Sequence, residues 1–251
     1  RNLPQENKKE LLLFFAKEAD RVGQKQAAAD VMDIYLTDKT LTREERIEAT
    51  ILLAQISYDK GQIDLAVAEF AKGAQELQKA GCKQNKCDEI RTHMRRFVTE
   101  LHRTKKLKPD NSLLNAYVTY NNTFGGDKDM LHRGSVVALE LKNYPTAIAL
   151  FRGISGNSKF SEKEREEAIL NEIKAAEQSN VSALKQAAYE NYLSNFPKSA
   201  KTFEIRYQLA YLSYQDKDYS KAVSAFTRLA KDDSGKMDLR KKSADLALDS
   251  L

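Results

Sequence analysis

Two segments of the chain, "LLAQISYDKGQIDLAVAEF" (Leu52–Phe70) and "QLAYLSYQDKDYSKAVSAF" (Gln208–Phe226), follow one pattern. In each, an alanine is followed twelve residues later by a second alanine, and four residues after that by a phenylalanine. Two antiparallel helices joined by a short turn can meet at this spacing, and their close approach requires small side chains at the crossing. The phenylalanine lies one helical turn further on, where it fills the space below the crossing. The pattern therefore predicts a helical hairpin in each segment.

The same arrangement of small anchor residues occurs at five places along the chain. The anchor pairs are Ala16 with Ala28, Ala54 with Ala66, Ser135 with Ala147, Ala176 with Ala188, and Ala210 with Ala222. The large residues that follow are Met32, Phe70, Phe151, Tyr192 and Phe226. The polar or glycine-bearing stretches "VGQK", "KGQI", "KNYP" and "KDYS" predict turns between anchors. The long interval between Ala66 and Ala147 predicts one more, degenerate pair at 88–108 and 112–124.

The composition favours a helical repeat protein over a disordered or β-rich chain. The 251 residues include only 10 Gly and 4 Pro, no Trp, and 31% charged side chains. The formal net charge of +5 is too small to imply nucleic-acid binding without a local cluster. The longest apolar run, "LLLFFA", is far shorter than the roughly 20 residues of a membrane span, so no transmembrane segment is predicted.

A period of about 34 to 41 residues with this pattern resembles the tetratricopeptide repeat (TPR) family. The matching residues are Leu53, Ala54, Gly61, Ala66 and Phe70 in one unit and Leu209, Ala210, Tyr214, Tyr219, Ala222 and Phe226 in another. The resemblance implies an all-α fold, an α-solenoid of about six antiparallel helix pairs forming a right-handed superhelix. The units of this single solenoid are expected at about 5–38, 42–78, 88–124, 128–156, 161–196 and 200–232, with a further or capping helix at 236–251 in what we expect to be a piece of a longer protein.

A second resemblance concerns the segment that leads into the last pair. Its residues Tyr192, Leu193, Phe196, Pro197 and Ser199 are similar to variant repeats of bacterial cell-envelope TPR proteins, such as outer-membrane assembly lipoproteins, cell-division coordinators and gliding-motility proteins. This resemblance implies a periplasmic or otherwise extracytoplasmic bacterial location. A cytoplasmic location is the alternative.

In the TPR family, ligands lie in a concave groove lined by the first helix of each pair. The matching positions here are Glu48, Ile51, Gln55 and Tyr58, then Asp129, His132, Val136 and Leu139, and finally Glu204, Tyr207, Tyr211 and Tyr214. The last three tyrosines share one helix face and combine apolar area with a polar tip, as binding hot spots do. We expect Tyr207, Tyr211 and Tyr214, with Gln55 and Tyr58, to bind a peptide or partner protein. Alternatively, the rings pack beneath a following helix.

The segment "IRTHMRRFVTELHRTKKLK" (Ile90–Lys108) predicts an amphipathic helix with a basic face. The apolar arc comprises Ile90, Met94, Phe97 and Leu101, and the opposite side carries Arg91, Arg95, Arg96, His102, Arg103 and Lys106. This basic face could bind phosphates, anionic lipid headgroups or an acidic protein, or it could be a solvated surface. Nucleic acid is disfavoured because no aromatic residues alternate with the basic ones.

The remaining chemistry-bearing residues predict no reactive centre. Cys82 and Cys87 are close enough in sequence to form a disulfide if the chain is extracytoplasmic, and free thiols are the alternative. A metal site would need more ligands, and His93, His102 and His132 do not have zinc-finger spacing. The sequence contains no phosphate-binding loop, nucleophile elbow or His-Glu-x-x-His motif. We therefore predict no catalytic residue, cofactor or metal.

These observations predict a non-catalytic scaffold that binds a peptide or partner protein in its groove, within a bacterial envelope complex. One alternative is a peripheral envelope module that binds peptidoglycan or anionic lipid through the basic face. A second alternative is a regulatory solenoid segment of a larger multidomain protein.

Overall fold

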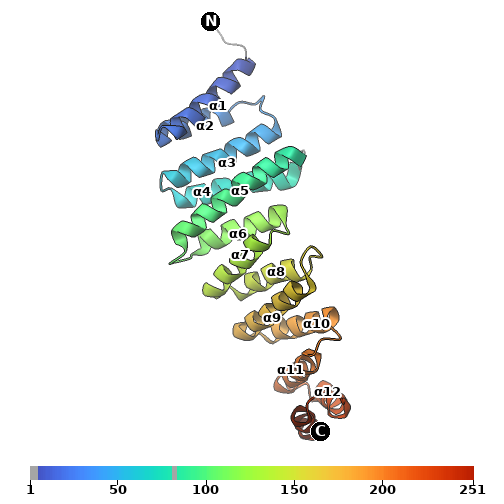
Figure 1. Ribbon diagram of the computed structural model, residues 1–251. Helices are drawn as coiled ribbons and strands as arrows, with labels where there is room; N and C mark the ends of the chain where they lie inside the picture. The colour runs from blue at the N-terminus through green and yellow to red at the C-terminus, as the bar shows by residue number, and fades with distance from the viewer. Residues whose placement is uncertain (1–4, 81–83) are drawn as a thin grey trace. The chain divides into compact units, whose positions relative to one another are not determined.

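The computed structural model describes residues 5–80 and 84–251, and all regular secondary structure in these ranges is α-helical (Figure 1). The helices are α1 (Gln5–Arg21), α2 (Lys25–Leu36), α3 (Arg43–Asp59), α4 (Ile63–Ala80), α5 (Gln84–Lys105), α6 (Asn111–Phe124), α7 (Lys128–Glu140), α8 (Tyr144–Ser155), α9 (Glu162–Ser179), α10 (Ser182–Asn195), α11 (Thr202–Gln215), α12 (Tyr219–Lys231) and α13 (Met237–Asp249). The chain is an all-α helical-repeat solenoid, which confirms the predicted fold class. None of the helices in the described ranges is both long and apolar enough to cross a bilayer.

The helices form two compact units whose boundary falls within α7, between Val137 and Ala138. In the first unit, α1 contacts α2, α3 contacts α4 and α5 contacts α6, and further contacts join α2 to α3, α3 to α5 and α4 to α6. In the second unit, α8 contacts α9, and each later helix through α13 contacts the one before it. Contacts are therefore made mainly between neighbours in sequence, as in repeat proteins.

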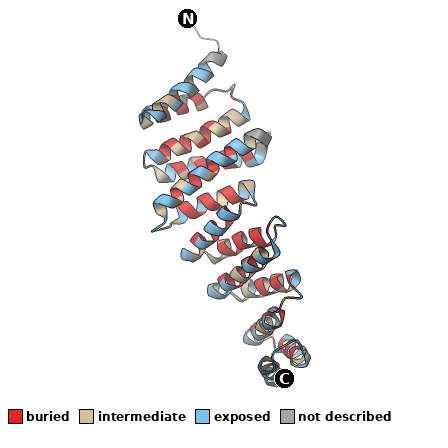
Figure 2. Cartoon of the chain, viewed as in Figure 1, coloured by how far each residue is buried: buried red, intermediate tan, exposed pale blue. Residues whose placement is uncertain are grey.

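The predicted anchors form the centre of the helix packing. All ten anchor residues are at most 2% exposed, and the five large residues that follow them are also buried. Figure 2 shows the buried positions as stripes along the helices, with exposed positions on the other side. Ala16, Ala28 and Met32 belong to one core cluster, and Ala210, Ala222 and Phe226 belong to another. The small residues thus occupy the tightly packed positions that the spacing predicted.

Four of the turns between paired helices share a residue in the left-handed region, five positions before the second anchor. These residues are Gly23 (φ 83°), Gly61 (φ 77°), Lys142 (φ 55°) and Lys217 (φ 62°). The next residue donates its N–H back across the turn in each case, as from Gln62 to the Ser57 carbonyl at 3.0 Å. This bond satisfies a carbonyl at the end of the first helix and allows the second helix to start at once.

The segment from Tyr192 to Ser199 links the end of α10 to the start of α11 and also contacts α9. The Tyr192 hydroxyl donates to Glu166 Oε1 on α9 at 2.5 Å, and Ser199 Oγ lies 2.8 Å from both of these oxygens. The Thr202 hydroxyl donates to the Phe196 carbonyl at 2.8 Å, at the start of α11. The motif residues that resemble envelope repeats are therefore structural elements of the junction between two helix pairs.

Candidate interaction site

In the first compact unit, α1, α3 and α5, each the first helix of its pair, line a pocket of about 320 Å³. We call it the first-helix pocket. Its lining comes from α1, α3 and α5 and consists of Asp20, Ile51, Leu52, Gln55, Tyr58, Asp59, His93, Arg96, Phe97, Glu100 and Arg103. Three of the four groove positions expected on α3 belong to it. The structure also brings Gln55 and Tyr58 together with Arg96 and Arg103, although the sequence had suggested two separate surfaces.

Phe97 and Tyr58 form a firm wall of this pocket. Phe97 is buried and stacks on Phe70 of α4 with ring centroids 4.7 Å apart, and its ring meets the Tyr58 ring edge-on at 5.9 Å. The Tyr58 hydroxyl donates to the Glu100 carbonyl at 3.1 Å and also contacts the Thr104 hydroxyl. Tyr58 therefore contributes to the packing of α3 on α5 and has only part of its ring available to a ligand.

The charges in the pocket are only partly paired with one another. Gln55 Nε2 donates to Glu100 Oε2 at 2.9 Å, and Arg96 Nε lies 2.8 Å from the other oxygen of this carboxylate. The hydrogen bond with Glu100 raises the pKa of the Arg96 guanidinium further above its usual range. Within the described ranges, neither His93 nor Arg103 has an ion-pair partner, and both side chains are exposed. These two residues are the groups left to meet an incoming acceptor.

The remainder of the predicted basic face is largely neutralised by nearby carboxylates. Arg91 Nη1 lies 3.3 Å from Asp88, and its guanidinium stands 5.2 Å from the centre of the Phe124 ring. Arg95 pairs with Asp127 at 3.0 Å and with Asp129 at 3.1 Å. The apolar arc of α5 is fully buried, as predicted, and Lys106 is exposed beyond the end of this helix. Among the described arginines and lysines of the basic face, Arg103 and Lys106 therefore lack an ion-pair partner, and of these two Arg103 lines the first-helix pocket.

The three tyrosines of α11 form a continuous row in the second unit. Tyr207 and Tyr211 stack with centroids 6.3 Å apart, and Tyr211 and Tyr214 stack at 6.2 Å. Tyr207 and Tyr214 pack against the core cluster that includes Phe226, whereas Tyr211 is 36% exposed. Burial raises the pKa of the Tyr207 hydroxyl. The row is therefore partly a packing surface, and Tyr211 is its most accessible member.

Several residues of the first-helix pocket have no distinctive signal in the sequence. Asp20, His93 and Glu100 enter it because α1, α3 and α5 lie beside one another, which no local motif of these residues reveals. Of the predicted cysteine pair, Cys82 lies outside the described residues, so the disulfide with Cys87 stays a prediction. In the part of the chain that the structure describes, no three His, Cys, Asp or Glu side chains gather as a set able to hold a metal ion.

No protein-family model matches the chain, and neither does any curated protein sequence. Among solved structures, the chain is similar to a tetratricopeptide repeat protein from Parabacteroides merdae, with 13% identity and a TM-score of 0.37 over 96% of this chain and 98% of that one. It is similar to the TPR2AB domain of yeast Sti1 in its pHSP90 complex, with 10% identity and a TM-score of 0.37 over 98% and 99% of the two chains.

A third similar structure is the C-terminal part of a TPR repeat-containing protein from Cytophaga hutchinsonii. It shares 14% identity and a TM-score of 0.34, over 93% of this chain and 98% of that one. All three scores are below 0.5. The resemblance to TPR repeats therefore rests on the chain's own anchor pattern and its buried helix pairs.

Proposed function

We propose that this chain is a non-catalytic interaction scaffold and that the first-helix pocket binds a segment of a partner protein. The observation that carries this proposal is the convergence of Gln55, Tyr58 and Arg103, from two helices, on one pocket with an apolar wall. Stacked helix pairs present such surfaces without rearranging, which suits the binding of a peptide or partner helix.

The chemistry of the pocket favours a peptide over a lipid headgroup or a glycan. Its lining combines exposed His93 and Arg103 with the carboxylates of Asp20, Asp59 and Glu100, which pair with Lys25 and Arg96, so the pocket has mixed charge and is not uniformly basic. Ile51 and Phe97 supply apolar area for a side chain beside these charges. The alternative of a peptidoglycan or anionic-lipid module is less well supported, because Arg91 and Arg95 already pair with carboxylates.

The proposal is tested with substitutions that leave the helix packing intact. The double variant His93→Ala/Arg103→Ala changes two exposed side chains of the pocket, whereas Lys106→Ala removes a nearby exposed cation outside it. In a quantitative pull-down from an extract of the source organism, the double variant should lose the main bound protein by at least about tenfold. Lys106→Ala should retain that protein. If all three forms recover the same proteins in the same amounts, the assignment of the pocket is wrong.

The cellular setting stays part of the proposal. The Tyr192 to Ser199 motif and the closely spaced cysteines support a bacterial extracytoplasmic location. Fractionation of the source cells with an antibody to the chain tests this directly, because a periplasmic protein is released by osmotic shock. Recovery only in the cytosolic fraction would contradict it.

A further inference from the structure

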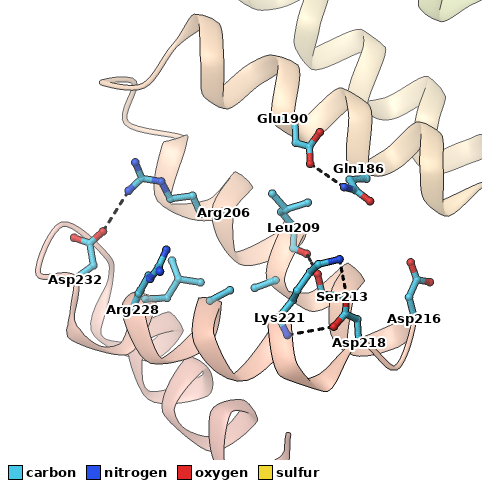
Figure 3. Close-up of a pocket in the computed structure, with 13 residues that line it drawn as sticks. Gln186, Glu190, Arg206, Leu209, Ser213, Asp216, Asp218, Lys221, Arg228 and Asp232 are labelled. Carbon is cyan, nitrogen blue, oxygen red and sulfur yellow. Dashed lines mark hydrogen bonds and ion pairs between the residues drawn. The ribbon is translucent and has the colours of Figure 1, made fainter.

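The second unit contains a larger groove of about 790 Å³ between α10 and α12, with α11 as its floor (Figure 3). We call it the second-helix groove. It is lined by Gln186, Glu190, Arg206, Leu209, Ala210, Ser213, Asp216, Asp218, Lys221, Ala225, Arg228, Leu229 and Asp232. None of the three tyrosines of α11 belongs to this lining, and helical spacing places them on a different face of α11. The groove is therefore a separate surface from the tyrosine row.

In the preceding repeat, a buried carboxylate and its hydrogen-bond partners occupy the place that corresponds to this groove. Glu172 of α9 is fully buried and accepts from Arg152 of α8 at 2.7 Å and from Asn191 of α10 at 2.8 Å. Its carboxylate thus ties together two consecutive second helices across the first helix between them. Burial raises the pKa of Glu172, and its two partners compensate for the loss of water.

The next repeat changes all three of these positions. Counted from the anchors Ala176 and Ala210, Glu172 corresponds to Arg206, so the charge at the centre is reversed. Arg152 corresponds to Leu193, and Asn191 corresponds to Ala225. Neither replacement can accept a hydrogen bond through its side chain. The hydrogen bonds that join Arg152, Glu172 and Asn191 therefore have no counterpart in the last repeat. The groove lies at that place instead, and Arg206 lines it.

Arg206 has only a weak local counter-charge. Its guanidinium lies 3.6 Å from Asp232, and its side chain is 50% exposed, whereas Glu172 is fully buried. Asp232 also accepts from the Ser234 N–H at 3.0 Å. Arg228 lines the same end of the groove, and no ion pair in the described part of the chain involves it (Figure 3). Two guanidinium groups thus lie at this end of the groove, and of the two only Arg206 is paired with a carboxylate, that of Asp232.

The other end of the groove has the opposite character. Asp216 and Glu190 line it together with the ion pair between Lys221 and Asp218 at 2.7 Å, so carboxylates outnumber cations there. Between the two ends lie Leu209 and Ala225, with other small or apolar side chains. A polyanion such as nucleic acid would be attracted at one end and repelled at the other.

We propose that the second-helix groove binds an acidic segment of a partner protein, with a carboxylate held between Arg206 and Arg228. An apolar side chain beside that carboxylate contacts Leu209 on the floor and Ala225 on α12, and a basic residue further along meets Glu190 and Asp216. The partner's carboxylate supplies the negative charge that Glu172 provides in the preceding repeat. Guanidinium groups suit this role because they bind a carboxylate through two parallel hydrogen bonds.

The test is a selection from a displayed library of random short peptides on the wild-type chain. Selected peptides should carry Asp or Glu next to apolar residues. Their affinity, measured by fluorescence anisotropy, should fall at least about tenfold in Arg206→Glu/Arg228→Glu, because each swapped charge repels the carboxylate. Ala225→Phe should give a similar loss without any change in charge, since the ring fills the middle of the groove beside Leu209. Lys231→Glu, on the same helix outside the groove, is the matched control and should bind as the wild type does.

Two results would overturn the proposal. One is that no selected peptide distinguishes wild type from the charge-swapped variant while circular dichroism shows both to be folded. The other is that the distinguishing peptides lack carboxylates. His93→Ala/Arg103→Ala should leave this binding unchanged, so failure here is separable from failure of the first-helix pocket.

Discussion

Lys142 and Lys217 hold a backbone conformation that ordinary residues avoid. Their φ values of 55° and 62° match the left-handed turns formed by Gly23 and Gly61 elsewhere in the chain. In the left-handed region, the Cβ atom of any residue other than glycine comes too close to the following carbonyl oxygen. This contact costs about 1–2 kcal/mol of conformational free energy per residue. The turn is retained because it satisfies the end of one helix and starts the next.

Replacing either lysine by glycine should therefore stabilise the protein. We expect Lys142→Gly and Lys217→Gly each to raise the free energy of unfolding by about 0.5–1 kcal/mol, after the extra freedom of glycine in the unfolded chain is deducted. Urea denaturation followed by circular dichroism measures this. Gly61→Ala is the reciprocal control and should lower the midpoint. A neutral result at both lysines would show that the left-handed turn carries no strain there.

Gly235, in the loop between α12 and α13, is required for a different reason. A Cβ at this position would lie 2.1 Å from Cε2 of the Phe203 ring, and Phe203 is buried at the start of α11. Because that ring packs against the core cluster of the last helix pair, it has little room to move.

Gly235→Ala should consequently destabilise the last helix pair by about 1–3 kcal/mol, the usual cost of overpacking. The additional change Phe203→Leu should recover part of this loss in the double variant, because the smaller side chain leaves room for the new methyl group. Thermal denaturation of the two single variants and the double variant measures the coupling. Additive losses would mean that the two side chains do not clash.

At the level of helices, the connection between α10 and α11 depends on the half-buried carboxylate of Glu166 on α9. Hydrogen bonds from Tyr192 and Ser199 hold the pKa of Glu166 below its ordinary value of 4.5. A lowered pKa in the folded state means that ionised Glu166 stabilises the fold above the unfolded pKa. This contribution is lost as the pH falls through the folded value.

Glu166→Gln should remove that pH dependence. Between neutral pH and about pH 4.5 the variant should be less stable than the wild type, and the difference should shrink at lower pH as the wild-type carboxylate becomes protonated. Urea denaturation at a series of pH values measures it. Glu167→Gln, at the neighbouring exposed position, is the control. A stability difference that does not change with pH would show that the loss comes from altered packing.

Helix positions were predictable because their determinants are local. The period of apolar residues and the small residues at the crossings depend only on neighbours within one hairpin. The degenerate pair α5 and α6 lacks a small buried first anchor, although Ala116 and Tyr120 of α6 are buried at the spacing of a second anchor and its large residue. Its packing also uses the large buried side chains of Phe97 and Tyr117. The long interval between Ala66 and Ala147 predicted this pair, and the amphipathic pattern supported its first helix.

At the level of the whole molecule, contacts link mainly helices that follow one another, so a local defect should remain local. Ala210→Leu places a larger side chain at a fully packed crossing in the second unit. It should lower the protection of amide hydrogens in α10 to α13 by about 1–3 kcal/mol and leave α1 to α4 unchanged. Ala54→Leu should give the reverse pattern. Hydrogen exchange with mass spectrometry measures both, and uniform loss of protection in either variant would indicate a single cooperative unit.

The candidate sites were predictable only in part. Gln55 and Tyr58 were expected in a groove, and Arg96 and Arg103 on a separate basic face, but the first-helix pocket contains all four. Their meeting depends on α3 and α5 lying side by side, which the spacing within one hairpin does not specify. The tyrosine row was expected to bind, and the structure shows that Tyr207 and Tyr214 also pack against the core.

The amino-acid sequence by itself determined that the chain folds into helical hairpins, and it located the five crossings that small anchor residues mark. These properties follow from helical periodicity and side-chain size, which act over a few turns. Only the tertiary structure decided which exposed side chains share a surface, such as Arg206 and Arg228 in the second-helix groove. That outcome depends on how one hairpin packs on the next, and therefore on contacts between residues far apart in sequence.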